Sequence, residues 1–177
     1  ELIDALRKLG EEGITDLILD LRVNGGGSVN SSILLASSIL GSSYEGKIYA
    51  TLDRHEKNKY DDSVCKLVTH NGTTALPSLN MPALWVIASN GTASASEMVI
   101  VGLDGLDVPV TVVGARTEGK NCGMDVIEKT FGSTTYSYAP ITFLNLNAKG
   151  FNDYGEGIEP DIDINSYMSK SSREEIQ

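Results

Sequence analysis

Two short apolar runs in the chain are each followed by a turn of small residues and then by a helical pattern. The first run covers residues 16–21 and leads through the sequence RVNGGG into an amphipathic helix predicted over residues 29–40. The second run, LWVIA at residues 84–88, leads through small residues into a helix predicted over residues 95–106. A strand, a tight turn and a helix in this order form the unit of α/β proteins. We therefore predict an α/β fold.

The rest of the chain supplies further strands around these two units. The expected elements are a helix over residues 2–9 that ends at Gly10 and Gly13, strands over residues 47–52, 64–68 and 110–113, two or three strands between residues 126 and 146, polar loops over residues 53–62 and 71–82, and a polar tail over residues 168–177. A chain of 177 residues suits one domain with a real core. We expect that domain to span residues 1–167, with Trp85 in its core and an ion pair between Asp20 and Arg22 at the end of the first strand.

The charge of the chain excludes one class of partner. The chain carries 14 Lys and Arg residues against 24 Asp and Glu residues, which gives a net charge of −10. Nucleic-acid affinity depends on neutralising phosphates with basic side chains, so we expect no nucleic-acid partner. No stretch approaches the roughly 18 apolar residues that a membrane span needs, so no span is expected. No signal peptide is visible, and because Glu1 lies at the start of a predicted helix we expect a fragment or a processed form.

The histidines and cysteines do not form a recognisable site. His55 and His70 lie in polar segments and are expected to be exposed, which leaves a Ser-His-Asp triad without its histidine. Cys65 and Cys122 lack the spacing of a zinc site, and the sequence does not decide whether they pair. We therefore predict no metal and no other cofactor.

A serine and a lysine are the strongest candidates for catalysis. Ser94 lies in the sequence GTASASE at residues 91–97, directly after a buried strand and at the start of a helix. That position provides free backbone N–H groups and the positive end of the helix dipole. Lys120 follows in the next loop, and a neutral lysine amine can take the proton of a serine hydroxyl.

Backbone amides near Ser94 are expected to stabilise a developing oxyanion. One donor would be the N–H of Ala95, and a second would come from Gly26 or Gly27 in the glycine loop that follows the other strand. Simpler interpretations stay open for the same residues. Ser94 and Glu97 match a capping box, Lys120 can be a solvated loop residue, and the glycine loop can be a plain turn between strand and helix.

Taken together, these elements resemble a known protease family. The resemblance rests on DLRVNGGG at residues 20–27, GTASASE at residues 91–97, Gly119-Lys120, and YGEGIEPD at residues 154–161. These segments look like the carboxyl-terminal processing (tail-specific) serine proteases, and the style is closest to the Bacteroides-type members. The resemblance implies a ClpP/crotonase-like protease core with mixed sheets and flanking helices.

The resemblance also assigns roles and a location. It implies that Ser94 is the nucleophile, Lys120 the base, and Ala95 one oxyanion donor, with Gly27 as the first choice and Gly26 as the second choice for the other donor. It further implies a protein of the cell envelope, the periplasm or the extracellular space.

Three departures from the family pattern stand out. Many members carry a glutamine four residues after the lysine, where this chain has Met124. The spacing from Glu97 to Lys120 is one residue longer than in the common form. The family usually carries a PDZ domain before the protease core, and we identify none in this chain.

The function predicted from the sequence is a serine endopeptidase. It would cleave extended peptides or protein C-terminal regions through a Ser-Lys dyad and an acyl-enzyme, with a peptide or protein as its partner. The alternative is a catalytically degenerate peptide-binding module on the same fold. A crotonase-type acyl-CoA enzyme is disfavoured, because so acidic a chain offers little to hold the CoA phosphates. The substrate and the oligomeric state are not predicted.

Overall fold

The computed structural model describes residues 1–57 and 62–164. The tail predicted over residues 168–177 and part of the predicted polar loop lie outside these residues. The elements follow one another as α1 (Leu2–Glu11), β1 (Ile18–Asp20), α2 (Val29–Leu40), the 3-10 helix η1 (Ser42–Tyr44), β2 (Ile48–Arg54), β3 (Ser63–Lys66), β4 (His70–Asn71), β5 (Thr74–Ala75), β6 (Leu84–Ala88), α3 (Ala95–Asp104), β7 (Val110–Gly114), β8 (Cys122–Met124), β9 (Ile127–Phe131), β10 (Thr134–Tyr138), β11 (Ile141–Asn147) and β12 (Ile162–Asp163).

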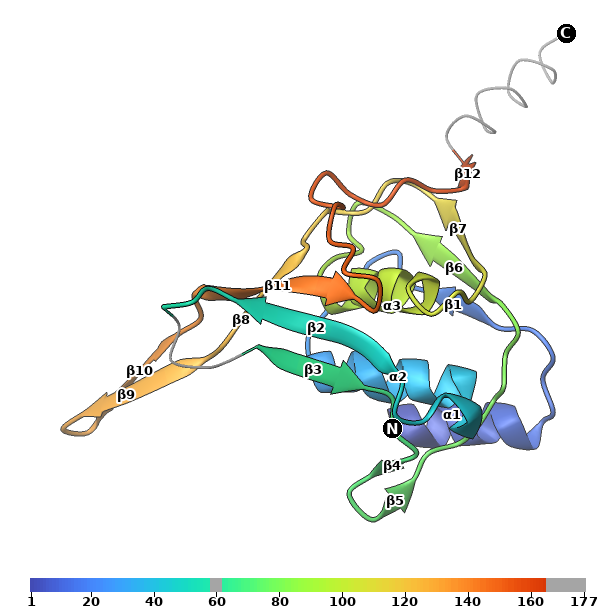
Figure 1. Cartoon of the computed structure of the whole chain (residues 1–177), viewed down its shortest axis with the longest axis horizontal. Helices are drawn as coiled ribbons and strands as arrows, with labels where there is room; N and C mark the ends of the chain where they lie inside the picture. The colour runs from blue at the N-terminus through green and yellow to red at the C-terminus, as the bar shows by residue number, and fades with distance from the viewer. Residues whose placement is uncertain (58–61, 165–177) are drawn as a thin grey trace, which may run out of the picture.

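Two four-stranded sheets and the helices between and beside them form the body of the protein (Figure 1). The first sheet has the order β1-β6-β7-β12, and all of its strand pairs are parallel. The second sheet has the order β3-β2-β11-β8, and all of its pairs are antiparallel. This confirms the predicted α/β class with mixed sheets and flanking helices.

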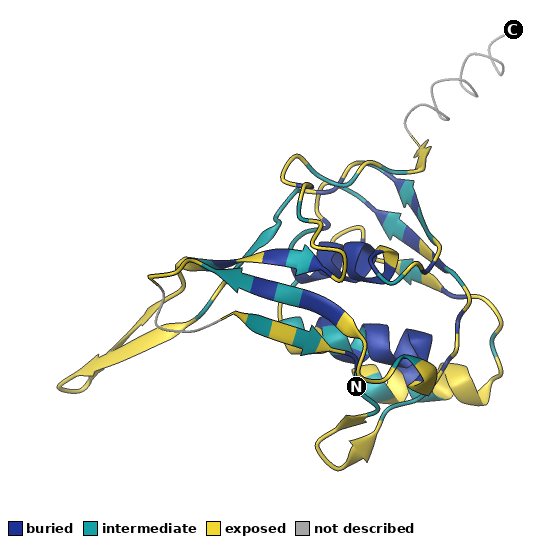
Figure 2. Cartoon of the chain, viewed as in Figure 1, coloured by how far each residue is buried: buried dark blue, intermediate teal, exposed yellow. Residues whose placement is uncertain are grey.

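Helix α3 lies between the two sheets and contacts strands of both, as well as α2. Every residue from Ala95 to Leu103 is buried, as Figure 2 shows along the length of this helix. A helix that is apolar on all sides belongs in the interior, where each side meets another element. The sequence of α3 therefore fixes its central place.

One glycine inside α3 allows the second sheet to approach closely. A Cβ atom at Gly102 would collide with the ring of Tyr49 on β2. The Tyr49 side chain is fully buried, and its hydroxyl donates to the carbonyl of Met98 at 2.9 Å. Glycine weakens a helix by roughly 1 kcal/mol relative to alanine. Here the packing of a large buried aromatic ring offsets that cost.

The structure corrects three local predictions. Gly10 does not end the first helix, which continues to Glu11 and is capped at Glu12. The segment predicted as a loop over residues 71–82 contains most of a two-stranded hairpin, β4 with β5. Trp85 was expected in the core but is 42% exposed, because side chains alternate along β6 and only the face carrying Leu84, Val86 and Ala88 is buried.

Candidate active site

The candidate site forms where the ends of two neighbouring parallel strands meet. Because β1 pairs with β6, the loop after β1 and the turn after β6 leave the sheet at the same edge. The buried Thr92 hydroxyl donates to the Leu21 carbonyl at 2.7 Å, and the Ala93 N–H donates to the Asn24 carbonyl at 3.2 Å. These bonds hold the glycine loop against the turn that carries Ser94.

Ser94 adopts a backbone conformation that is rare for serine. Its φ is 57° and its ψ is −121°, and α3 begins at the next residue. Such strained residues persist where surrounding contacts enforce them, and they cluster at functional sites. The Ser94 side chain faces the Glu97 amide as in a capping box, but among the described residues it makes no cap hydrogen bond of normal geometry. The capping-box arrangement of Ser94 and Glu97 is therefore present, without a standard cap hydrogen bond from the Ser94 hydroxyl.

Glu97 joins the turn that carries Ser94 (residues 89–94, the serine turn) to the loop that carries Lys120 (residues 115–121, the lysine loop). Its side chain is fully buried, and its carboxylate accepts four hydrogen bonds. The donors are the backbone N–H of Ser94 at 2.8 Å, the hydroxyl of Thr117 at 2.6 Å, the N–H of Gly119 at 2.7 Å and the N–H of Lys120 at 2.9 Å. Four donated bonds match the acceptor sites of an ionised carboxylate. Glu97 thus fixes the backbone of both candidate residues.

The glycine loop packs directly against the backbone of the serine turn. Gly26 has a φ of +93°, and a Cβ atom there would collide with the Ala93 carbonyl and the Ala95 nitrogen. The Gly26 N–H donates to the Asn24 side-chain oxygen at 3.1 Å, and the Ser96 hydroxyl donates to the same oxygen at 2.9 Å. Position 26 therefore requires glycine for both conformation and space.

Among the three candidate oxyanion donors, Gly26 differs from Gly27 and Ala95 in its hydrogen bonding. The Gly26 N–H is already bound to Asn24, whereas the N–H groups of Gly27 and Ala95 donate to no other described residue. Ala95 is the first residue of α3, where backbone N–H groups have no partner within the helix. Gly27 and Ala95 also line the same pocket. Their position favours Gly27 over Gly26 as the second donor.

The lysine loop is held from outside by the segment after β11. A Cβ atom at Gly119 would collide with the Gly155 carbonyl and the Gly157 nitrogen. Thr117 exchanges two further bonds with this segment, because its N–H donates to the Ile158 carbonyl at 3.1 Å and its hydroxyl accepts from the Ile158 N–H at 2.7 Å. The segment at residues 154–161 therefore braces the loop that carries Lys120.

Ser94 and Lys120 face one pocket of about 370 Å³. The lining residues are Gly25, Gly27, Ser28, Val29, Ser94, Ala95, Met98, Lys120, Cys122, Gly123, Met124, Phe143 and Asn145. Within residues 1–57 and 62–164, the Ser94 hydroxyl and the Lys120 amine share no hydrogen bond, and the amine makes no ion pair. Catalytic hydrogen bonds are often long in the absence of substrate. Lysine can act as a base only when a carboxylate does not hold it charged.

Cys122 lines this pocket, whereas His55, His70 and Cys65 do not. His55 and His70 are exposed, and Asp20 pairs with Arg22 at 2.6 Å as predicted. Asp107 forms an ion pair with Lys149 at 2.6 Å. Both cysteines are free. The described residues contain no cluster of three or more His, Cys, Asp or Glu side chains placed to hold a metal ion.

Sequence reasoning missed the polar side chains that support the site. Thr117 and Asn145 are buried polar residues near Lys120, and Asn24 is an exposed residue whose side-chain oxygen accepts from the Ser96 hydroxyl near Ser94. The only sequence signal for Asn24 was its place directly before the glycines. Asn145 carried a weaker one, a polar residue between the apolar positions of an expected strand.

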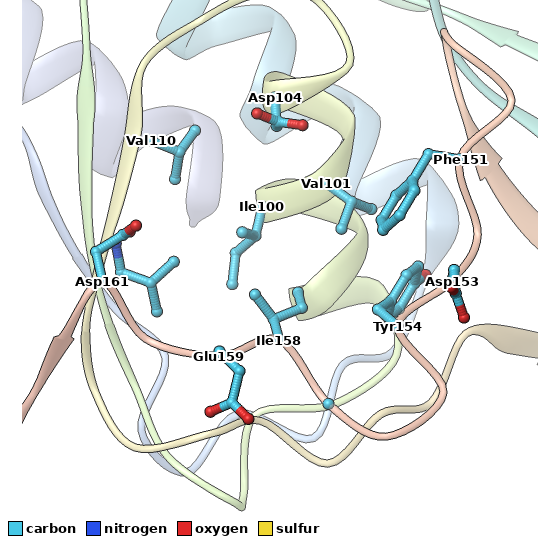
Figure 3. A pocket seen from close by; sticks show the side chains of 12 residues that line it. Ile100, Val101, Asp104, Val110, Phe151, Asp153, Tyr154, Ile158, Glu159 and Asp161 are labelled. Atoms are coloured by element: carbon cyan, nitrogen blue, oxygen red, sulfur yellow. The ribbon is translucent and has the colours of Figure 1, made fainter.

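A second pocket, of about 300 Å³, lies beside α3 (Figure 3). It is lined by twelve residues, which include Ile100 and Val101 of α3, stacked Phe151 and Tyr154, and carboxylates such as Glu159 and Asp161. Glu159 pairs with Arg116, and Asp161 accepts from the Val112 N–H at 2.7 Å. Among the described residues, no serine, cysteine, histidine or lysine lines this pocket. It therefore lacks side chains like the candidate nucleophile and base of the first pocket.

No helix among the described residues is long and apolar enough to cross a membrane.

Comparison with known proteins points in one direction. The sequence model described as Peptidase family S41 matches residues 1–164. A probable CtpA-like serine protease of Staphylococcus aureus (strain COL) is 28% identical over 166 residues, which are 94% of this chain and 30% of that protein. The chain thus spans about a third of the length of the curated relatives it matches.

Solved structures share the fold. A putative S41 protease from Bacteroides fragilis superposes with a TM-score of 0.81 at 24% identity, covering 95% of this chain and 43% of that one. The photosystem II D1 C-terminal processing protease superposes with a TM-score of 0.61 at 23% identity, covering 90% of this chain and 37% of that one. At these identities the likeness establishes the fold alone.

Proposed function

The chain belongs to peptidase family S41, and from this premise we propose that it is the core of a serine endopeptidase that uses Ser94 and Lys120. Its substrates are extended peptides or the C-terminal regions of proteins. The resemblance to carboxyl-terminal processing proteases supports this substrate class. We propose one protease core over residues 1–167 and action in the cell envelope, the periplasm or outside the cell.

One observation carries the proposal. The buried Glu97 carboxylate binds the backbone N–H of Ser94 and the backbone N–H of Lys120, and it leaves the lysine amine free in the pocket that the serine faces. A nearby carboxylate that paired with the amine would hold it charged and oppose base catalysis. Here the carboxylate positions the lysine loop and is itself occupied by other donors.

The reaction follows from these positions. The neutral Lys120 amine takes the Ser94 proton while the serine oxygen attacks the peptide carbonyl carbon. The N–H groups of Ala95 and Gly27 stabilise the resulting oxyanion. The C–N bond breaks, the leaving amine takes the proton from the Lys120 ammonium, and an acyl-enzyme forms. A water molecule gives its proton to Lys120, attacks the ester and releases Ser94 by the same steps.

The pocket suggests how a substrate is held. Val29, Met98 and Phe143 form its apolar lining beside Ser94, which suits an uncharged side chain next to the scissile bond. An extended peptide would add as a strand next to the antiparallel sheet, where main-chain hydrogen bonds supply affinity.

Peptide cleavage by matched variants tests the proposal. Ser94→Ala and Lys120→Ala should each lower kcat/KM by roughly a thousandfold or more, since the first removes the nucleophile and the second removes its base. Lys8→Ala is the control, because Lys8 is exposed on α1. Equal cleavage by all four proteins would refute the dyad. Peptide binding without cleavage by the wild type would identify a degenerate binding module instead.

A further inference from the structure

Two asparagines on the inner face of β11 differ in the hydrogen bonds that their side chains make. The Asn147 amide donates to the Val101 carbonyl at 3.0 Å and accepts from the Lys149 and Phe151 N–H groups at 2.9 Å and 3.0 Å. Asn145 is equally buried, with 6% of its surface exposed, yet its Oδ1 has no hydrogen-bond partner among the described residues. Buried polar atoms are nearly always bonded, so an orphaned oxygen requires an explanation.

The backbone of Asn145 is fixed next to the lysine loop. Its N–H donates to the carbonyl of Asn121, the residue after Lys120, at 3.0 Å. Its own carbonyl accepts from the Asn152 side chain at 2.9 Å. With the backbone held on both sides, the side chain is placed in the lining of the pocket that Ser94 and Lys120 share.

Tyr154 lies close to the Asn145 side chain. Burial raises the pKa of Tyr154 to about 12, against an opposing contact from the Asn145 amide, so the phenol is neutral at physiological pH. Its hydroxyl, too, has no hydrogen bond of normal geometry within the described part of the chain. Its ring forms a wall of the second pocket beside Phe151 (Figure 3). The Asn145 side chain therefore lines the Ser94 pocket and is also close to Tyr154, which borders the second pocket.

Apart from Asn145, the described residues that line the pocket offer no strong side-chain acceptor for an amine. Besides Ser94 and Asn145, Ser28 is the third lining residue with a side-chain oxygen, and this oxygen accepts from the Ser31 N–H at the N-terminus of α2. Met124 contributes a thioether, which is a weak acceptor. Asn145 alone among the lining residues carries a carbonyl oxygen in its side chain.

We infer that Asn145 is a positioning residue for Lys120: the lysine amine, which lines the same pocket, turns to donate a hydrogen bond to the unpaired Asn145 Oδ1 in the catalytically competent arrangement. This inference rests on the proposed function. A neutral amine has two N–H bonds and one lone pair. Holding one N–H at Asn145 limits rotation about the Cε–Nζ bond and directs the lone pair toward the Ser94 hydroxyl.

The test compares the two asparagines by the same substitution. Asn145→Leu removes the orphaned oxygen, so kcat should fall 10- to 100-fold while KM changes less than twofold and Tm does not fall. Asn147→Leu removes three satisfied bonds, so Tm should fall while kcat per folded molecule stays near that of the wild type. Asn145→Asp keeps an acceptor oxygen and should retain at least ten times the kcat of Asn145→Leu, each measured at its own pH optimum.

Two outcomes separate this inference from the proposed function. If Lys120→Ala is inactive and Asn145→Leu keeps kcat within twofold of the wild type, the positioning role is wrong and the dyad stands. If Lys120→Ala is as active as the wild type, the dyad itself is wrong.

A measurement independent of catalysis complements the kinetics. In protein labelled with ¹⁵N-lysine, the Lys120 Nζ signal should show slow hydrogen exchange in the wild type and in Ser94→Ala. That protection should be lost in Asn145→Leu. Equal exchange in the wild type and in Asn145→Leu would overturn the inference.

Discussion

The two regions that supply the candidate dyad are built in different ways. The serine turn is local: β6, the turn and α3 follow one another within residues 84–104, and the strained Ser94 conformation lies between them. The lysine loop has no such unit of its own. Glu97 holds it from α3, and the segment around Gly155 and Gly157 holds it from the far end of the chain.

The difference indicates which part of the site should keep its geometry when distant contacts are changed. A nucleophile on a β–turn–α unit keeps its place as long as that unit folds, whereas the base depends on contacts between distant segments. Within residues 1–57 and 62–164, Glu97 is the one side chain that binds both regions. Changes in the serine turn, at Glu97 and in the lysine loop should therefore have distinct effects.

The largest effect is expected from Gly26→Ala, in the glycine loop that packs against the serine turn. The added methyl group would collide with the Ala93 carbonyl and the Ala95 nitrogen, and φ at this position is +93°. We expect kcat/KM to fall by roughly a thousandfold, because the oxyanion donors move. Circular dichroism and peptide-cleavage kinetics measure the outcome.

Gly25→Ala is the matched control, because a Cβ atom there meets no atom within 4 Å. It should keep the Tm of the wild type. If Gly26→Ala behaved like Gly25→Ala in both fold and activity, the close fit of the loop to the turn would be wrong.

The next effect is expected from Glu97→Gln, which acts on both regions at once. The amide nitrogen cannot accept the bonds that one carboxylate oxygen now takes from the N–H groups of Ser94 and Lys120. We expect a loss of about 2–4 kcal/mol in unfolding free energy, from the unpaired buried donors. Thermal denaturation should show Tm lower by roughly 5–15 °C.

Glu118→Gln provides the comparison for this change, because Glu118 is exposed one residue before Gly119. Its unfolding free energy should stay within about 0.5 kcal/mol of the wild type. Equal stability of the two variants would show that Glu97 does not join the two regions.

The smallest effect is expected from Thr117→Val, a substitution within the lysine loop. The change keeps the shape but removes the hydroxyl that donates to Glu97 and accepts from the Ile158 N–H. We expect a loss of about 1–2 kcal/mol, measured by urea denaturation. The serine turn should stay intact, so a serine-directed covalent inhibitor should still label Ser94. Loss of labelling would contradict the claim that the serine turn keeps its structure when the lysine loop is perturbed.

Local patterns predicted much of the fold and the nucleophile. The helix at residues 29–40 and the strand at residues 84–88 were found with their observed bounds, because apolar periodicity and small-residue turns are local signals. The exposure of Trp85 was not found, because it depends on which face of the sheet the helices cover. The Glu97 contacts and the orphaned Asn145 oxygen were not found either, since they depend on pairing between segments far apart in the sequence.

Trapping the acyl-enzyme by mass spectrometry tests the central claim most directly. The full chain, incubated with an activated peptide ester and quenched in acid, should gain the mass of the acyl group on the proteolytic fragment that contains Ser94. Lys120→Ala should show no such adduct on the same time scale, because the serine hydroxyl lacks its base. An acyl group on another residue, or equal acylation of Ser94 in the Lys120→Ala variant, would contradict the account.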